Sequence, residues 1–296
     1  KYIHDQSVRL FNGGATPNEV AEQITLPENL RTSFPNRGYY GTLKHNAKAV
    51  YQNYLGWYDA NPANLDPLPP QNSAQRYIKL MGGIEQVVKQ AQIAFDQAEE
   101  DAGAYRWVAE LLNKAIFAEP EHKEAKALLA RTYDQLGYQA ESAPWRDVYL
   151  SAAYELRHGG PEKGINISLM REVLLETPVE RFFDTLSIRL NGPKAEGEDY
   201  AIKINFTDKK LSYVLNIENS VLYHQSSESW ANKTAGPINT TLNVKHELFI
   251  DMLIGRADLK KTLFSDDLSI DGSKLDLLGF LSLFDRPMGD FDIVVP

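Results

Sequence analysis

The chain has 296 residues, 43% of them hydrophobic and 24% charged, a balance typical of an ordinary globular protein with room for two or three domains. Its net charge of −9 and pI near 5.3 leave no basic surface to neutralise phosphates, so nucleic acid and anionic membrane surfaces are disfavoured as partners. The absence of cysteine excludes disulfides, and no apolar run reaches the roughly 20 residues of a membrane-spanning helix.

Two short helices are predicted at the start of the chain. Residues 2–12 carry apolar side chains at helical spacing and are stopped by the glycines at 13–14. Thr16 then precedes Pro17 and, three residues on, Glu19, which together make a capping box. The sequence therefore predicts a second helix that begins directly after Thr16.

Residues 36–62 form the most informative stretch. They place His45 after a loop rich in glycine and directly before an amphipathic helix. The apolar positions of that helix are Ala47, Val50, Tyr51, Tyr54, Leu55 and Tyr58. The loop carries Arg37, Tyr39 and Tyr40, whose guanidinium and hydroxyl groups suit an oxyanion, although an arginine that caps a turn and tyrosines that pack are equally common. A lone histidine at such a place is more often a hydrogen-bonded turn residue than a metal ligand.

A helical region is predicted between two linkers. Residues 59–73 are rich in proline, asparagine and aspartate and indicate a loop and the first candidate domain boundary. Residues 83–158 indicate successive amphipathic helices joined by short turns, similar to a tetratricopeptide-like pair, and residues 159–164 indicate a second linker. Because stacked repeats need at least about three units to be stable alone, we expect this region to pack on another domain or on a second copy.

Beyond residue 164 the pattern changes to α+β. Thr177 and Glu180, on either side of Pro178, indicate another capping box. Alternation of apolar and polar residues then predicts about five strands, around Ile188 and Leu190, Ala201 to Phe206, Tyr213 to Ile217, Val221 and Tyr223, and Thr240 to Val244. A helix over 245–254, a strand near 268–271 and an apolar closing helix over 273–284 complete the pattern. This order suggests a sheet covered on one face.

Several strings of the sequence together resemble one enzyme family. They are YIHDQSVRL, RGYYGT, KHN, AVYQNYLGWYDANPANLDPLPP, RYIKLMGG, YRWVAELLNKAIFAEP and EAKALLARTYDQLGYQAESAPWRDVYL. In this order they resemble the linear alkyl sulfatases of the metallo-β-lactamase superfamily, zinc enzymes that hydrolyse dodecyl sulfate and similar surfactants. The resemblance covers residues 2–159 and continues more weakly to the end, where VKHELFIDMLIGRADLKKTLFSDDLSIDG is similar to the sterol-carrier-type domain of these sulfatases.

The resemblance implies a multidomain α and α+β protein. Residues 1–72 would be the helical tail of a metallo-β-lactamase-like catalytic domain, residues 73–160 an all-α tetratricopeptide-like dimerisation domain, and residues 161–296 a sterol-carrier-like α+β domain. It also implies a homodimer formed through the helical domain, an alkyl sulfate or another molecule with an apolar chain as ligand, and a periplasmic or secreted location.

The resemblance further implies which metal ligands lie elsewhere. In the family the two zinc ions are held mainly by an HxHxDH motif and two acidic residues, all upstream of the segment that matches Lys1, and this chain has no HxH and no HxxxH. At most one zinc ligand, His45, would be present here. Arg37, Tyr39 and Tyr40 would hold the sulfate ester. The chain resembles the C-terminal half to two-thirds of such an enzyme and by itself would be inactive.

Two functions therefore stay open. The chain is part of a zinc-dependent alkyl sulfatase that hydrolyses alkyl sulfate esters to alcohol and sulfate, or it is a non-catalytic fragment acting in dimerisation and apolar-ligand binding. A weaker third reading is a related metallo-hydrolase with a different ester. An alkyl chain could lie beside the closing helix, although helices of this kind are more often plain core. The candidate lining groups are Trp57, Trp230, Met252 and Met288.

Overall fold

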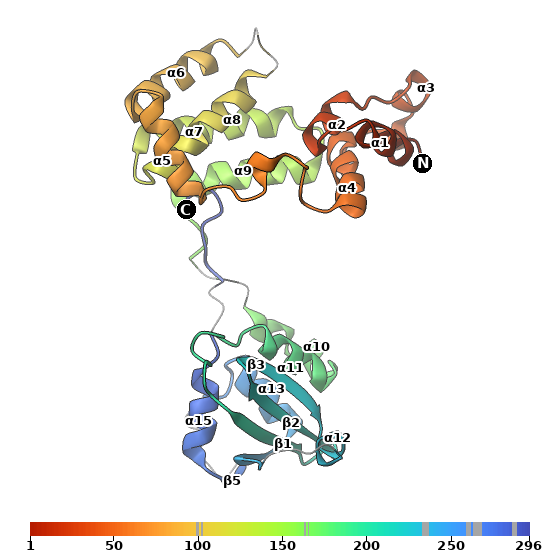
Figure 1. The fold of residues 1–296 in the computed structure, drawn as a ribbon, viewed down its shortest axis with the longest axis vertical. Helices are drawn as coiled ribbons and strands as arrows, with labels where there is room; N and C mark the ends of the chain where they lie inside the picture. The colour runs from red at the N-terminus through yellow and green to blue at the C-terminus, as the bar shows by residue number, and fades with distance from the viewer. Residues whose placement is uncertain are drawn as a thin grey trace. The chain divides into compact units, whose positions relative to one another are not determined.

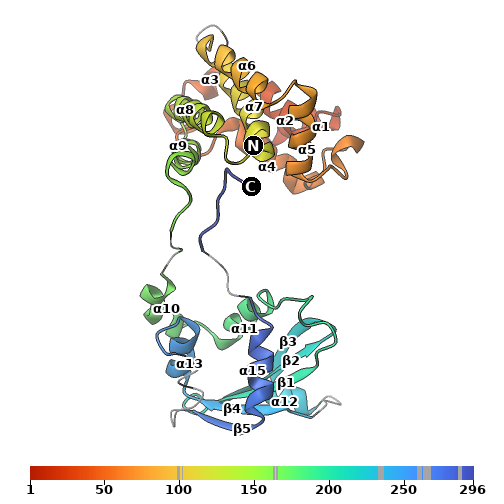
Figure 2. The ribbon, with the colours of Figure 1, turned by 90° about the vertical axis from the view of Figure 1, so that its left-hand side faces the viewer.

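The computed structural model describes residues 1–98, 101, 103–162, 164, 166–232, 237–258, 262, 268–285 and 289–296. The chain divides into two compact units, which we name the helical unit (residues 1–162 and 291–296) and the α+β unit (residues 163–290). Figure 1 and Figure 2 show the helices of the first unit and the sheet of the second. The expectation of a helical region followed by an α+β region is confirmed.

Short helices at the start of the helical unit surround a small core. They are α1 (Tyr2–Asn12), α2 (Pro17–Gln23), α3 (Glu28–Arg31), η1 (Phe34–Asn36) and α4 (Leu43–Leu55). The core between α1, α2 and α4 contains Val20, Ile24 and Ala47. The predicted capping box is confirmed, because the Thr16 hydroxyl accepts the Glu19 N–H at 3.4 Å and the Glu19 carboxylate accepts the Thr16 N–H at 2.8 Å.

Longer helices build a second, larger core in the same unit. They follow η2 (Pro62–Asn64) and are α5 (Pro70–Leu80), α6 (Ile84–Asp96), α7 (Ala104–Ala118), α8 (Lys123–Gln139) and α9 (Ala143–His158). Each packs on its neighbours around fully buried residues such as Val108, Leu112 and Leu129. The loop predicted over residues 59–73 is too long, because Pro70 opens α5, and proline is tolerated in the first helical turn.

The last six residues return to the helical unit and form what we name the C-terminal strap (residues 291–296). The buried carboxylate of Glu155 on α9 accepts the backbone N–H groups of Ile293 at 3.0 Å and Val294 at 2.7 Å. Asp292 accepts the N–H of Gly160 at 3.1 Å, and Val294 is buried in the core of α5 to α9. These contacts join the strap to the helical unit, and the bounds of the expected 161–296 domain stay a prediction.

The α+β unit is a mixed five-stranded sheet with helices. Its elements are η3 (Ile167–Met170), α10 (Arg171–Leu175), α11 (Val179–Ser187), β1 (Tyr200–Phe206), β2 (Leu211–Glu218), β3 (Val221–Ser226), α12 (Ser227–Ala231), β4 (Thr240–Val244), α13 (His246–Leu253), β5 (Ser269–Gly272) and α15 (Lys274–Ser282). The strand order is β3-β2-β1-β4-β5, in which β1 and β4 are parallel and the other pairs antiparallel. The turn between β2 and β3 is a tight hairpin with positive φ at Asn219 and Ser220, which suits the twist of the strands.

One face of this sheet carries the core of the unit. Alternate residues of β1, β2 and β4, such as Ile204, Leu215 and Leu242, pack against Phe249 of α13 and Phe280 of α15. Helices α11, α13 and α15 contribute to the same core (Figure 2). The expectation of a sheet covered on one face is confirmed for the residues that the structure describes.

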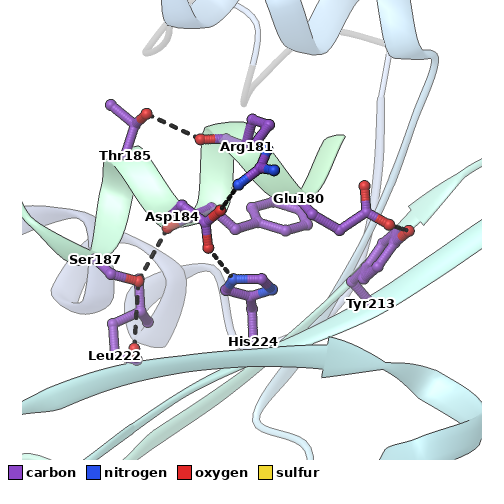
Figure 3. A network of polar contacts seen from close by, with 9 residues as sticks. Glu180, Arg181, Asp184, Thr185, Ser187, Tyr213, Leu222 and His224 are labelled. Carbon is purple, nitrogen blue, oxygen red and sulfur yellow. Dashed lines mark hydrogen bonds and ion pairs between the residues drawn. The ribbon is translucent and has the colours of Figure 1, made fainter. Parts of the chain in front are cut away.

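The predicted capping box at Thr177 is wrong. Helix α11 begins at Val179, and the Thr177 hydroxyl donates to the carbonyl of Val173 at 2.9 Å instead of accepting an N–H of α11. The Glu180 carboxylate accepts a hydrogen bond from the hydroxyl of Tyr213 on β2 (Figure 3). The side chain that local sequence assigns to the cap is therefore used to fasten α11 to the sheet.

The first predicted strand, around Ile188 and Leu190, is also wrong. Among the described residues Leu190 makes only an isolated bridge with Phe284, and Ile188 follows the end of α11 with its side chain 84% exposed. Alternation over three residues is too short to specify a strand without a neighbouring strand to pair with.

Candidate functional site

A broad groove of about 1450 Å³ lies in the helical unit beside the loop that precedes His45. It is lined by residues 35–44 of that loop, by the start of α1, by the end of α2 and by residues 138–146 at the corner between α8 and α9. Arg37, Tyr39 and Tyr40 all belong to this lining. The structure therefore brings the three predicted substrate-binding residues to one concave surface.

His45 lies in the first turn of α4, between Lys44 and Asn46, which line this groove. The Thr42 hydroxyl caps the helix by accepting the His45 N–H at 2.9 Å, which fixes the backbone of His45. The indole Nε1–H of Trp145 donates to His45 Nδ1 at 3.3 Å, and the two rings meet edge to face. Because Nδ1 accepts this hydrogen bond, the neutral imidazole carries its proton on Nε2 and presents a donor on its exposed side.

This arrangement does not by itself fit a zinc ion. Among the residues that the structure describes, no group of three or more histidine, cysteine, aspartate or glutamate side chains could hold a metal. A ligand histidine usually donates its second N–H to an acceptor, whereas Nδ1 of His45 faces the N–H of Trp145. We derive no catalytic step through a metal, and the assignment of His45 as a zinc ligand stays a prediction.

Arg37 joins its loop to the turn between α8 and α9. Its guanidinium donates from Nε to Glu141 Oε1 at 2.7 Å and makes a second contact from Nη2 to the same carboxylate. The carbonyls of Tyr39 and Tyr40 accept hydrogen bonds from the Ala143 N–H and the Ser142 hydroxyl. The positive charge of Arg37 is therefore already paired.

The side chains of Tyr39 and Tyr40 remain open to the groove. They are 52% and 75% exposed, and no hydrogen bond from their hydroxyls is present among the described residues. Their role as substrate-binding residues stays a prediction. Sequence reasoning did not single out Glu141 and Trp145, the long-range partners of this loop, because they lie about a hundred residues away; the string ESAPWRDVYL was the available signal.

The candidate groups for an apolar chain are divided between the two units. Trp57 follows α4 with 69% of its side chain exposed, and Trp230 lies on α12 of the other unit. Met252 packs at the edge of the core of the α+β unit, and Met288 lies outside the described residues. The idea of an alkyl-chain tunnel beside α15 stays a prediction.

Two further histidines, His122 and His224, join elements that lie far apart in the sequence. His122 caps α8, because its Nδ1 accepts the Ala125 N–H at 3.2 Å while its Nε2 meets Glu85 at 3.2 Å. In the α+β unit, His224 of β3 meets Asp184 of α11 at 2.8 Å (Figure 3). This contact lowers the pKa of Asp184 below its usual value. Each contact joins two elements that the sequence separates.

None of the described helices has both the length and the apolar character that crossing a membrane requires.

Comparison with known proteins identifies both parts of the chain. Residues 16–159 match the family described as alkyl sulfatase dimerisation, and residues 168–296 match the family described as alkyl sulfatase C-terminal. The chain belongs to the alkyl sulfatase family and corresponds to the C-terminal part of its members.

Individual relatives are similar to this chain over its whole length. It is 40% identical to a linear primary-alkylsulfatase of Pseudomonas sp. and 39% identical to an alkyl/aryl-sulfatase of Saccharomyces cerevisiae, covering all of this chain and 42% and 44% of those proteins. The solved structure of the stereoselective inverting secondary alkylsulfatase Pisa1 from Pseudomonas sp. superposes with a TM-score of 0.87 at 35% identity, over all of this chain and 45% of that one. The chain thus spans less than half the length of these relatives.

Proposed function

We propose that this chain is the C-terminal part of an enzyme that hydrolyses alkyl sulfate esters to an alcohol and sulfate. The observation that carries the proposal is the match to proteins named alkylsulfatases along the entire chain, in sequence and in structure. Segments outside this sequence would hold two zinc ions and would provide most of their ligands. The metal would polarise the ester and activate water. The periplasmic or secreted location belongs to the same proposal.

A substrate panel tests this proposal. The longest natural polypeptide that contains this sequence should release sulfate from primary or secondary alkyl sulfates and should leave phosphate and carboxylate esters of the same alcohols intact. Faster hydrolysis of a phosphate or carboxylate ester would favour the related metallo-hydrolase instead. No hydrolysis of any ester would favour the non-catalytic role in assembly and apolar-ligand binding.

We propose that His45 acts in this enzyme as a hydrogen-bond donor to the ester. Support comes from Trp145, whose N–H occupies Nδ1 and leaves the proton on the exposed Nε2. His45→Ala in the longer polypeptide should then lower turnover by about 100-fold, as loss of a positioned proton donor does, while bound zinc stays constant. Loss of zinc from this variant would instead support the assignment as a metal ligand. Metal analysis of the purified variant decides between the two roles.

We propose that the helical unit forms a homodimer. Support comes from the dimerisation family that covers residues 16–159 and from the apolar side chains that α5 to α7 expose. Those side chains include Tyr77, Leu80, Ile93 and Trp107, which are 42% to 83% exposed. Sedimentation equilibrium should give twice the 33.4 kDa mass of the chain. A mass of one chain at micromolar concentration would contradict the proposal.

A further inference from the structure

The charges that line the groove are not equivalent. Five cationic side chains belong to the lining: Lys1, Arg31, Arg37, Lys44 and Arg146. Four of them have a carboxylate partner, respectively Asp5, Glu28, Glu141 and Glu22. Arg146 has none among the described residues, since its guanidinium donates only from Nη2 to the carbonyl of Ala140 at 2.8 Å. Of these five side chains, Arg146 is therefore the one without a carboxylate contact among the described residues, while Lys44 shares Glu22 with Arg106.

The position of Arg146 relates it to His45. Arg146 lies in the first turn of α9, directly after Trp145, whose indole holds the ring of His45. The contact between Trp145 and His45 thus joins the start of α9 to the start of α4, and both Trp145 and Arg146 line the groove. A guanidinium offers five N–H donors in one plane, so four remain after the bond to Ala140.

Backbone groups at the start of α9 cannot bind an anion in its place. The Ala143 N–H donates to the Tyr39 carbonyl, and Pro144 has no N–H. The N–H groups of Trp145 and Arg146 donate to the side chain and the carbonyl of Ser142. Recognition of an anion here therefore depends on side chains.

We propose that Arg146 binds the anionic head group of the substrate, a sulfate monoester, and that Arg37 instead holds its loop to the turn before α9 through Glu141. This inference rests on the function proposed above. The planar fork of a guanidinium matches two oxygens of a sulfate group, and a charge-assisted hydrogen bond of this kind is roughly twice as strong as a neutral one. Arg146 is then a specificity-determining residue in the half of the enzyme that this chain represents.

Binding to the 296-residue chain tests the assignment first. Wild type and variants are titrated with hexyl sulfate and, separately, with inorganic sulfate, with tryptophan fluorescence and calorimetry as readouts. Arg146→Gln should weaken binding of hexyl sulfate by about tenfold or more, and Arg146→Lys should recover part of the affinity because it keeps the charge but not the fork. Arg76→Gln is the matched control and should bind as wild type, because Arg76 is an exposed residue of α5 outside the groove and, among the described residues, bonds Asn72 alone.

Arg37→Gln separates the two arginines. It should lower the thermal midpoint of the helical unit by releasing Glu141, and it should weaken hexyl sulfate less than Arg146→Gln does. The inference is overturned if Arg146→Gln binds as tightly as wild type, if Arg37→Gln causes the larger loss, or if the wild-type chain binds no sulfate ester. Equal affinity for hexyl sulfate and inorganic sulfate would show recognition of the sulfate group alone and would still support the assignment.

Kinetics of the longer polypeptide distinguish a failure of this inference from a failure of the proposed function. Arg146→Gln should raise the KM for hexyl sulfate by about tenfold, with kcat changed by less than about threefold, because a head-group contact made equally in ground and transition states affects binding alone. Unchanged KM in a wild-type enzyme that hydrolyses the ester would overturn the inference only. A wild-type enzyme that hydrolyses no alkyl sulfate would overturn the proposed function.

Discussion

At the scale of single residues, the phenol of Tyr213 reports how α11 packs on the sheet. Tyr213 is 8% exposed on β2 and donates a hydrogen bond to Glu180 of α11 (Figure 3). Burial, and then this hydrogen bond and the charge of Glu180, raise the pKa of Tyr213 to about 12. Because the folded pKa exceeds the ordinary value of 10.0, the stabilisation is complete below pH 10 and is lost as the pH rises toward 12.

Tyr213→Phe should lower the free energy of unfolding by about 1–3 kcal/mol at pH 8, because it removes a hydrogen bond to a charged group and leaves Glu180 unpaired. It should also flatten the loss of stability at alkaline pH. Urea unfolding followed by circular dichroism between pH 8 and 11 measures both effects. Tyr133→Phe is the control variant. Burial also raises the pKa of Tyr133 to about 12, but this residue lies in the helical unit. An alkaline slope that Tyr213→Phe leaves unchanged would contradict this account.

Buried His246 should make the folded protein less stable at acid pH, whereas Tyr213 does so at alkaline pH. It is 3% exposed, it packs on Phe206, and its Nε2 has no hydrogen-bond partner among the described residues. Burial, and then the charge of Lys209, lower the pKa of His246 below its ordinary value of 6.5, although Asp208 and Glu176 oppose the shift. As the pH falls below 6.5, His246 therefore binds a proton in the unfolded chain but stays neutral in the folded chain. The free energy of unfolding then decreases.

His246→Phe should remove this acid dependence and change stability at pH 7.5 by less than about 1 kcal/mol, since an apolar ring of similar shape replaces a group with an unmet polar atom. Urea unfolding of the variant and wild type at pH 5, 6 and 7.5 gives the comparison. His158→Gln, at a histidine that stacks on Tyr154 in the helical unit, serves as control. Retention of the full acid slope in His246→Phe would show that other groups cause it.

At the scale of elements, the C-terminal strap depends on one carboxylate. Glu155 accepts the N–H groups of Ile293 and Val294 in a buried place, and unpaired buried N–H groups cost about 1–3 kcal/mol. Glu155→Ala should therefore raise amide hydrogen exchange at these two residues by about tenfold or more and lower the thermal midpoint of the helical unit. Glu121→Ala, whose side chain is 97% exposed, should do neither. Unchanged exchange in Glu155→Ala would contradict the role of Glu155.

The helices and turns that the sequence predicts correctly have their signals within a few residues. The capping box at Thr16 and the first helix, which the glycines at 13–14 stop, are of this kind. Local reasoning failed where a distant partner decided the outcome. Glu180 bonds Tyr213 rather than its own helix start, and the parallel pairing of β1 with β4 needs the whole intervening hairpin in place.

The candidate site follows the same division. The loop and helix around His45 could be predicted, because glycine spacing and an amphipathic pattern lie in one stretch of sequence. The pairing of Arg37 with Glu141 and the hydrogen bond from Trp145 could not, because the partners lie 104 and 100 residues apart in the sequence. These long-range contacts decide which cation is free and which nitrogen of His45 is exposed.

At the scale of the whole molecule, the account rests on this chain being one part of an alkyl sulfatase. The most direct measurement compares sulfate release from dodecyl sulfate by the longest natural polypeptide that contains the sequence with release by the 296-residue chain at equal concentration. We expect the longer polypeptide to release one sulfate per alcohol formed and the 296-residue chain to release none. Hydrolysis by the 296-residue chain alone, or none by the longer polypeptide, would contradict the account.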